Sequence, residues 1–149
     1  MIRARLARLL PLQARGRAVA ARAKGERMKK KILCVDDSKT ALFMVTTILK
    51  KGPYEIVTAH DGQQAVEVAS SERPDLILMD VIMPRMTGFE ACRELKQRDD
   101  TKTIPVILVT TRGEEENVEN GFASGCNDYV TKPINAQELL AKVRDHIAS

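Results

Sequence analysis

The stretch Asp75–Gly88, "DLILMDVIMPRMTG", is the most informative part of the sequence for the fold, because it places an acid, Asp80, directly behind four apolar residues. A carboxylate is costly to bury unless it is paired or hydrogen-bonded. The same pattern occurs at Lys31–Ser38, "KILCVDDS", where an apolar run stops at Asp36 and Asp37. Two predicted core strands therefore end in acids.

From Met28 onward, short apolar runs alternate with amphipathic segments, a pattern typical of βαβ units and a parallel sheet. The predicted strands are Lys31–Val35, Glu55–Ala59, Asp75–Met79, Pro105–Val109 and Asp128–Thr131. The predicted helices are Lys39–Lys50, Gly62–Ser70, Gly88–Gln97, Glu114–Ser124 and Ala136–Ile147. Pairs at capping-box spacing mark three of the helix starts: Thr87 with Glu90, Asp61 with Gln64, and Asn135 with Glu138. We predict an α/β fold with a single doubly wound, five-stranded parallel sheet and five helices.

Composition and charge divide the chain of 149 residues into two parts. Residues 1–27 hold seven Arg and one Lys against one acid, a charge of +7, so the rest of the +4 chain carries −3. Such a segment could be a basic arm for nucleic acid or a membrane surface. Met28 is a plausible start, however, and we favour a disordered extension or a misassigned start for 1–27, with one domain over 28–149.

The three cysteines, Cys34, Cys92 and Cys126, are far apart in the sequence and lack metal-ligand spacing. They are typical of reduced thiols, so we expect a cytoplasmic protein. No apolar run approaches the roughly 20 residues that span a bilayer, and we expect no membrane association.

The acids are predicted to meet at one edge of the sheet. In a sheet ordered 2-1-3-4-5, the first and third strands are neighbours, so Asp36, Asp37 and Asp80 converge at their carboxyl ends, where doubly wound sheets form their sites. The repulsion between like charges this close must be relieved by protons or by a cation, and Mg²⁺ suits an all-oxygen site. Each acid alone could be a helix cap or a turn residue. Capping does not explain acids at the ends of two adjacent core strands.

The last two strands add a hydroxyl and an ammonium at the same edge. The fourth, "PVILVTT", reaches Thr110, and the fifth, "DYVTKP", ends at Lys132 before Pro133. Alone, each is an ordinary strand-end or loop residue. With the acids, they form a set suited to binding a phosphoryl group.

These motifs together resemble the response-regulator receiver domain of two-component signalling, in its stand-alone, CheY-like form. "VDDS", "LILMDVIMPRMTG", "VILVTT" and "GCNDYVTKP" occur in the expected order, and the resemblance covers Lys29 to about Ile147. It implies a flavodoxin-like fold with the order 2-1-3-4-5, which is the order known for the chemotaxis protein of this family.

The resemblance also implies a role for each site residue. Asp80 is the phosphoacceptor, and Mg²⁺ is held by Asp36, Asp37, Asp80 and the main-chain carbonyl of Ile82. Lys132 pairs with the phosphoryl group or with Asp80. Thr110 is the switch hydroxyl and Tyr129 the aromatic that follows it, and the Lys132–Pro133 bond is expected to be cis.

Two positions depart from the chemotaxis pattern. Ile82 replaces a polar Asn, and Arg112 replaces an acid. Because both flank the path of an attacking water, we predict an altered and longer phosphoryl lifetime. Glu114, Glu115, Glu116 and Glu119 form an acidic run on the expected output face, where a solvated helix side is an equally good interpretation.

The expected partners follow from the same resemblance. A histidine kinase or phosphotransfer protein donates the phosphoryl group, and a separate protein receives the signal, since the chain ends after the fifth helix. We expect a monomer that does not bind nucleic acid directly and is not an enzyme beyond slow autodephosphorylation.

Two other function classes fit the sequence less well. The alternative is a pseudo-receiver, a binding module that works without phosphorylation, but such proteins usually lack an acceptor, acid or lysine that this chain keeps. An aspartate-nucleophile phosphatase would need an acid two residues after its nucleophile, where Ser38, Lys39 and Ile82 stand.

Overall fold

The fold comes from a computed structural model that describes residues 29–111 and 115–147, with side chains omitted for 115–118. The chain divides into two units, Met1–Lys30 and Lys31–Ser149, and the fold below is that of the second, with its first strand beginning at Lys30. The expected extension 1–27 and Met28 lie outside the described residues.

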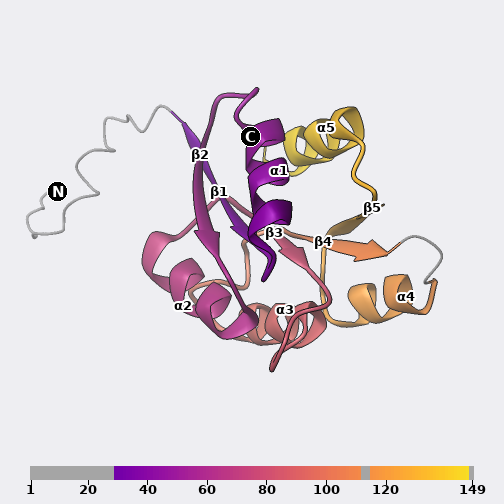
Figure 1. Cartoon of the computed structure of the whole chain (residues 1–149). Coiled ribbons are helices and arrows are strands. Elements are labelled where there is room, and N and C mark those ends of the chain that lie inside the picture. The colour runs from indigo at the N-terminus through magenta and orange to yellow at the C-terminus, as the bar shows by residue number, and fades with distance from the viewer. Residues whose placement is uncertain (1–28, 112–114, 148–149) are drawn as a thin grey trace, which may run out of the picture. The chain divides into compact units, whose positions relative to one another are not determined.

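Five parallel strands form one sheet in the order β2-β1-β3-β4-β5, flanked by helices (Figure 1). The strands are β1 (Lys30–Val35), β2 (Tyr54–Ala59), β3 (Leu76–Asp80), β4 (Val106–Thr111) and β5 (Asp128–Lys132). The helices are α1 (Lys39–Leu49), α2 (Gly62–Glu72), α3 (Gly88–Gln97), α4 (Glu115–Ala123) and α5 (Ala136–Ile147). The predicted α/β class, strand order and element sequence are confirmed.

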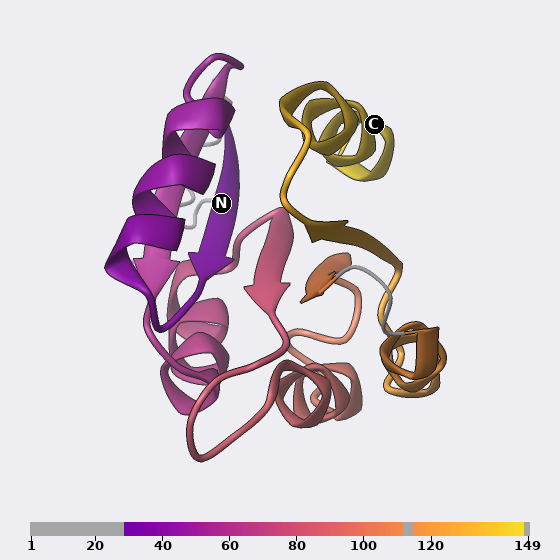
Figure 2. The ribbon, with the colours of Figure 1, turned by 45° about the vertical axis from the view of Figure 1, so that its right-hand side comes forward.

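The helices lie in two layers, α1 and α5 on one face of the sheet and α2, α3 and α4 on the other (Figure 2). Successive side chains of a strand point to alternate faces of the sheet, so each strand contributes side chains to two hydrophobic cores. One core contains Leu33, Ile77 and Leu108, and the other contains Ile32, Leu78 and Ile107. Apolar side chains on both sides explain why the strands read as nearly continuous hydrophobic runs.

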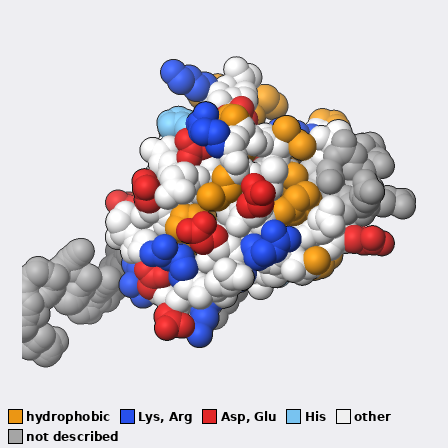
Figure 3. Space-filling view, turned by 90° about the horizontal axis from the view of Figure 1, so that it is seen from below, with side chains coloured by type: hydrophobic (Ala, Val, Ile, Leu, Met, Phe, Trp, Pro, Cys, Tyr) orange, Lys and Arg blue, Asp and Glu red, His pale blue; other side chains and the backbone are white. Residues whose placement is uncertain are grey.

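The surface over α2, α3 and α4 carries mixed charge. Lys and Arg side chains alternate there with Asp and Glu side chains (Figure 3). Over the described part of this face there is no basic stripe of the kind that nucleic-acid-binding surfaces present.

The predicted helix caps are present. Thr87 and Glu90 form a reciprocal capping box at α3, Asp61 accepts from the N–H of Gln64 at 2.8 Å, and Asn135 accepts from the N–H of Glu138 at 2.9 Å. These side chains satisfy main-chain donors that a helix start leaves free.

Several boundaries differ from the prediction by one or two residues. The third strand was predicted at Asp75–Met79 but runs from Leu76 to Asp80, because Asp80 pairs in register with Val109 of β4. β4 likewise continues to Thr111, opposite Lys132 of β5. α1 ends one residue early, with Lys50 as its cap. α2 runs two residues further to Glu72, and Arg73 then stops it in the left-handed conformation.

Candidate functional site

The ends of β1 and β3 bring three carboxylates together. Val35 pairs with Met79, so Asp36 follows β1 beside Asp80, the last residue of β3. Asp36 and Asp80 are buried, 7% and 5% exposed, while Asp37 is exposed. One carboxylate oxygen from each of Asp36, Asp37 and Asp80 lies within 4.8 Å of the others. The predicted convergence of these acids is therefore present in the fold.

Local hydrogen bonds fix the β1–α1 turn that carries two of these acids. The Asp36 carboxylate accepts from the N–H of Ser38 at 2.9 Å, and the Asp36 N–H donates to the carbonyl of Ala59 at 3.2 Å. Ser38 is the N-cap of α1, with its hydroxyl accepting from the N–H of Ala41. Because Ser38 performs the capping, a cap role does not account for Asp37.

Lys132, the last residue of β5, supplies the cation among these acids. Its Nζ lies 3.0 Å from Asp80 Oδ1 and 3.7 Å from Asp36 Oδ2. Partial burial alone would lower the Lys132 pKa, but the contacts with Asp80 and Asp36 outweigh burial and hold that pKa above its ordinary value. The Lys132–Pro133 peptide bond is cis, as expected.

The charge balance at Asp80 favours a further cation. Burial raises the pKa of Asp80 above its ordinary value, the hydrogen bond from Lys132 opposes this, and the nearby charges of Asp36 and Asp37 add to it. Among the described residues, the Lys132 ammonium contacts two of the three clustered carboxylates, Asp80 and Asp36, so negative charge is in excess there. An all-oxygen set with excess negative charge fits a hard divalent ion such as Mg²⁺, so the donor chemistry agrees with the expected metal.

Thr110 is positioned on β4 next to this group. Its side chain is 2% exposed, and within the described residues its Oγ1 is the buried side-chain oxygen or nitrogen that has no hydrogen-bond partner. A buried hydroxyl without a partner costs free energy. The Thr110 hydroxyl is therefore available to donate a hydrogen bond to a group that binds at the site. β4 and β5 pair Leu108 with Tyr129 and Thr110 with Thr131, so Thr110 and Tyr129 lie on the same face of the sheet.

The β3–α3 loop runs close behind Asp80. The Gly88 N–H donates to the carbonyl of Val81 at 2.9 Å, and a Cβ added to Gly88 would lie 2.3 Å from the main-chain oxygen of Asp80. Only glycine allows this approach.

Ile82, which precedes this turn, is 65% exposed. Arg112, the other residue expected to affect phosphoryl lifetime, lies outside the described residues, as does Glu114. The side chains of Glu115 and Glu116 are likewise not described, and Glu119 is exposed.

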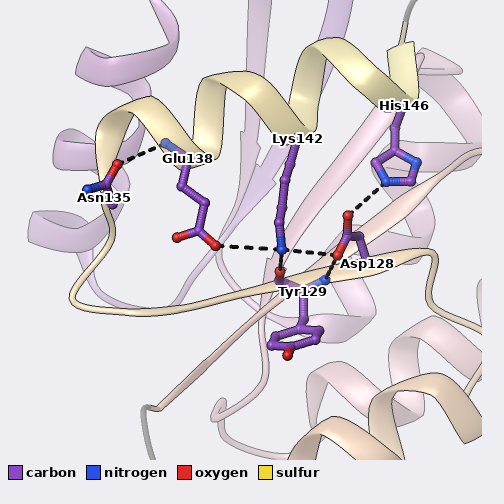
Figure 4. Close-up of polar contacts among 6 residues, drawn as sticks. All are labelled: Asp128, Tyr129, Asn135, Glu138, Lys142 and His146. Carbon is purple, nitrogen blue, oxygen red and sulfur yellow. Dashed lines mark hydrogen bonds and ion pairs between the residues drawn. The ribbon is translucent and has the colours of Figure 1, made fainter.

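A polar cluster that we did not predict joins α5 to the start of β5 (Figure 4). Asp128 Oδ1 lies 3.2 Å from Lys142 Nζ, and Asp128 Oδ2 lies 3.0 Å from His146 Nε2. Glu138, Lys142 and His146 follow one another at spacings of four, which places them on one face of a helix. That spacing was the available signal, but it does not identify Asp128 as the partner.

Within the described ranges, none of the helices is both long and apolar enough to cross a membrane. All three cysteines are free and buried. The cytoplasmic location stays a prediction.

Comparison with known proteins identifies close relatives. A family model described as the response regulator receiver domain matches residues 32–144. The protein PilH of Pseudomonas aeruginosa is 39% identical over 118 residues, which cover 79% of this chain and 98% of PilH. The alkaline phosphatase synthesis transcriptional regulatory protein PhoP of Bacillus subtilis is 37% identical over 78% of this chain, but the match spans only 48% of PhoP.

Solved structures similar to this chain include receiver proteins. The chemotaxis protein CheY4 of Vibrio cholerae is 36% identical with a TM-score of 0.74, over 79% of this chain and 98% of CheY4. The receiver domain of the sensor histidine kinase PA1611 of Pseudomonas aeruginosa is 31% identical with a TM-score of 0.76, over 81% of this chain and 99% of that domain. The latter structure has a magnesium ion coordinated in its active-site cleft.

Proposed function

Because this chain belongs to the response-regulator receiver family, whose model matches residues 32–144, we propose that it accepts a phosphoryl group on Asp80 and passes the signal to a separate protein. The observation that carries the proposal is the Asp80 carboxylate, buried at the end of β3 with Lys132 Nζ at 3.0 Å and two further acids beside it. Receiver domains are signalling proteins rather than enzymes in the usual sense.

The transfer reaction follows from these groups. An oxygen of Asp80 attacks the phosphorus of a phosphohistidine on the donor, the P–N bond breaks as the O–P bond forms, and an aspartyl phosphate results. Lys132 offsets charge on the transferred oxygens and holds Asp80 in place. Thr110 donates its free hydroxyl to one of those oxygens.

The metal ligands in this proposal are Asp36, Asp37, Asp80 and the main-chain carbonyl of Ile82. Bound there, Mg²⁺ would neutralise developing charge on the phosphoryl oxygens. The support comes from this chain's own acids, which crowd negative charge around Asp80. Slow hydrolysis by water resets Asp80.

The partners are proposed on the same basis. We expect a histidine kinase or phosphotransfer protein as donor, and an unidentified protein as target. Exposed apolar side chains on α1, Phe43 at 71% and Met44 at 59%, supply a surface close to the acceptor end of the sheet. A monomer in the cytoplasm remains the expected state.

The test is intact mass after incubation with a small acyl-phosphate donor, with Mg²⁺ or with a chelator. We expect wild type to gain one phosphoryl group only with Mg²⁺, and Asp80→Asn to gain none. Asp99→Asn, which removes a surface acid that is 97% exposed and that pairs with Lys102, is the matched control and should behave as wild type. Wild type that gains no mass under any condition would instead support the pseudo-receiver alternative.

A further inference from the structure

Lys142 of α5 reaches the edge strand β5 and contacts Tyr129 in two ways (Figure 4). Its Nζ donates to the main-chain carbonyl of Tyr129 at 2.6 Å and lies 5.0 Å from the centroid of the tyrosine ring. The second distance is within the range of cation–π attraction. Lys142 is 26% exposed, so its ammonium meets the ring partly out of water, where such attraction is stronger.

The position of the ammonium does not depend on the ring. Lys142 Nζ also lies 3.2 Å from Asp128 Oδ1 and 3.6 Å from Glu138 Oε2. Asp128 is itself held by His146 Nε2 at 3.0 Å and by the Tyr129 N–H at 2.8 Å. These contacts hold the Lys142 ammonium at one place beside β5 independently of the tyrosine ring. A group that positions another side chain must be held in this way.

A second contact of the ring comes from α4. Phe122 meets Tyr129 edge to face, with ring centroids 6.0 Å apart and planes at 86°. On the neighbouring strand, the buried Thr110 Oγ1 lies on the same face of the sheet and has no hydrogen-bond partner among the described residues. The ring is thus held by α4 and α5, next to the hydroxyl that is proposed to move toward a phosphoryl group.

We propose that Lys142 is a positioning residue that favours the present location of the Tyr129 ring and so sets how readily the chain adopts its signalling conformation. If the ring turns away, the cation–π contact is lost while the bond to the Tyr129 carbonyl remains. Lys142 therefore stabilises one ring location specifically and opposes the change that phosphorylation brings. This inference rests on the proposed function, phosphorylation of Asp80, and on the role that the family resemblance implies for Tyr129, the aromatic that follows Thr110.

The size of the effect follows from the kind of contact. A cation–π contact at a partly exposed site changes a two-state equilibrium by about two- to fivefold. A ligand can shift that equilibrium only by its difference in affinity for the two states, so removing the contact should ease activation by the same factor.

The test observes the ring directly. The chain contains two tyrosines, so 3-fluorotyrosine labelling gives two fluorine NMR signals, with Tyr54 on β2 as the internal reference. In unphosphorylated protein we expect Lys142→Met to move the Tyr129 signal, toward its position in phosphorylated wild type, and Lys142→Arg, which keeps the cation, to leave it near wild type. Tyr54 should not change. An unmoved Tyr129 signal in Lys142→Met, or an equal shift in Lys142→Arg, overturns the proposal.

A rate measurement separates ring positioning from general loosening of α5. Lys142→Met should speed phosphorylation by the small donor about two- to fivefold when Tyr129 is present, but not in a Tyr129→Leu background. An equal change in both backgrounds overturns the proposal. Intact mass of the same samples reports phosphorylation separately. Absence of phosphorylation would contradict the proposed function, while the comparison of unphosphorylated NMR samples would still decide the role of Lys142.

Discussion

Asp80 and Lys132 illustrate why the site depends on a pair of residues. Asp80 is buried among like charges, and a carboxylate left alone there would carry a large desolvation cost. Lys132 Nζ at 3.0 Å compensates part of that cost. In the proposed transfer the same ammonium would meet the oxygens of the phosphoryl group, so one contact would both stabilise the resting site and prepare the reaction.

At the residue scale, Ile82 is the described residue that we propose affects the phosphoryl lifetime. Its side chain is 65% exposed two positions beyond Asp80 and has no group that can orient an attacking water. We predict that Ile82→Asn shortens the phosphoryl lifetime several-fold, measured as loss of mass after removal of the donor, and that Ile82→Leu keeps the wild-type lifetime. An Asn variant that loses phosphate no faster than wild type would show that Ile82 does not set the lifetime.

The environment of Asp128 predicts how the stability of the fold depends on pH. Burial alone would raise its pKa, but hydrogen bonds from His146, the Tyr129 N–H and Lys142 outweigh burial and hold the pKa below its ordinary value of 3.8. A carboxylate with a lowered folded-state pKa adds stability above its unfolded pKa and loses it as pH falls through the folded value. We therefore expect Asp128→Asn to lower the free energy of unfolding at pH 7.

The difference in the free energy of unfolding between wild type and Asp128→Asn should shrink as pH falls below about 4. Denaturant unfolding of both proteins at several pH values measures this difference. Asp99→Asn, at an almost fully exposed acid, serves as the control and should track wild type throughout. A gap between Asp128→Asn and wild type that stays constant down to acid pH would mean that the charge of Asp128 is not what stabilises the cluster.

At the scale of elements, α3 begins unusually close to β3. A Cβ at Gly88 would lie 2.3 Å from the Asp80 carbonyl oxygen, whereas one at Gly121 of α4 would meet its nearest neighbour at 3.3 Å. We predict that Gly88→Ala destabilises the fold by about 1–3 kcal/mol, as overpacking does, and slows phosphorylation by displacing Asp80. Gly121→Ala should be close to neutral in both assays. Equal thermal unfolding of Gly88→Ala and wild type would refute the close approach.

The order of elements along the chain followed from sequence because each signal is local. Apolar runs mark the strands, and caps such as Thr87 with Glu90 mark helix starts. The end of β3 did not follow, because Asp80 looks like a residue after the strand until its pairing with Val109 is known. The convergence of Asp36, Asp37 and Asp80 was predictable from the order of the strands. The Asp128–Lys142 contact was not, because it depends on how α5 crosses β5.

At the scale of the whole molecule, the proposed docking and signalling surfaces adjoin each other. The carboxyl ends of the strands carry Asp80, the proposed acceptor, with α1 next to it, while α4 and α5 contact Tyr129 of the edge strand β5. Because α1 and α5 lie on the same face of the sheet (Figure 2), a donor that docks on α1 would lie beside one of the elements proposed to signal.

The exposed apolar side chains of α1 predict where a donor protein docks. Phe43 is 71% exposed on α1, so Phe43→Asp should leave folding intact. It should slow phosphotransfer from a phosphohistidine protein about tenfold, as loss of one aromatic anchor at an interface does. Phosphorylation by the small acyl-phosphate donor, which needs no docking surface, is the control and should be unchanged. Equal slowing with both donors would place the defect in the acceptor site rather than in docking.

The most direct test of the account is to locate the phosphoryl group within the chain. Protein phosphorylated in Mg²⁺ is treated with borohydride, which reduces an aspartyl phosphate to homoserine, and its peptides are then sequenced by mass spectrometry. We predict homoserine at Asp80 and at neither Asp36 nor Asp37. Homoserine at one of those two acids, or phosphate retained on a serine, threonine or histidine, would contradict the assignment of Asp80 as the acceptor.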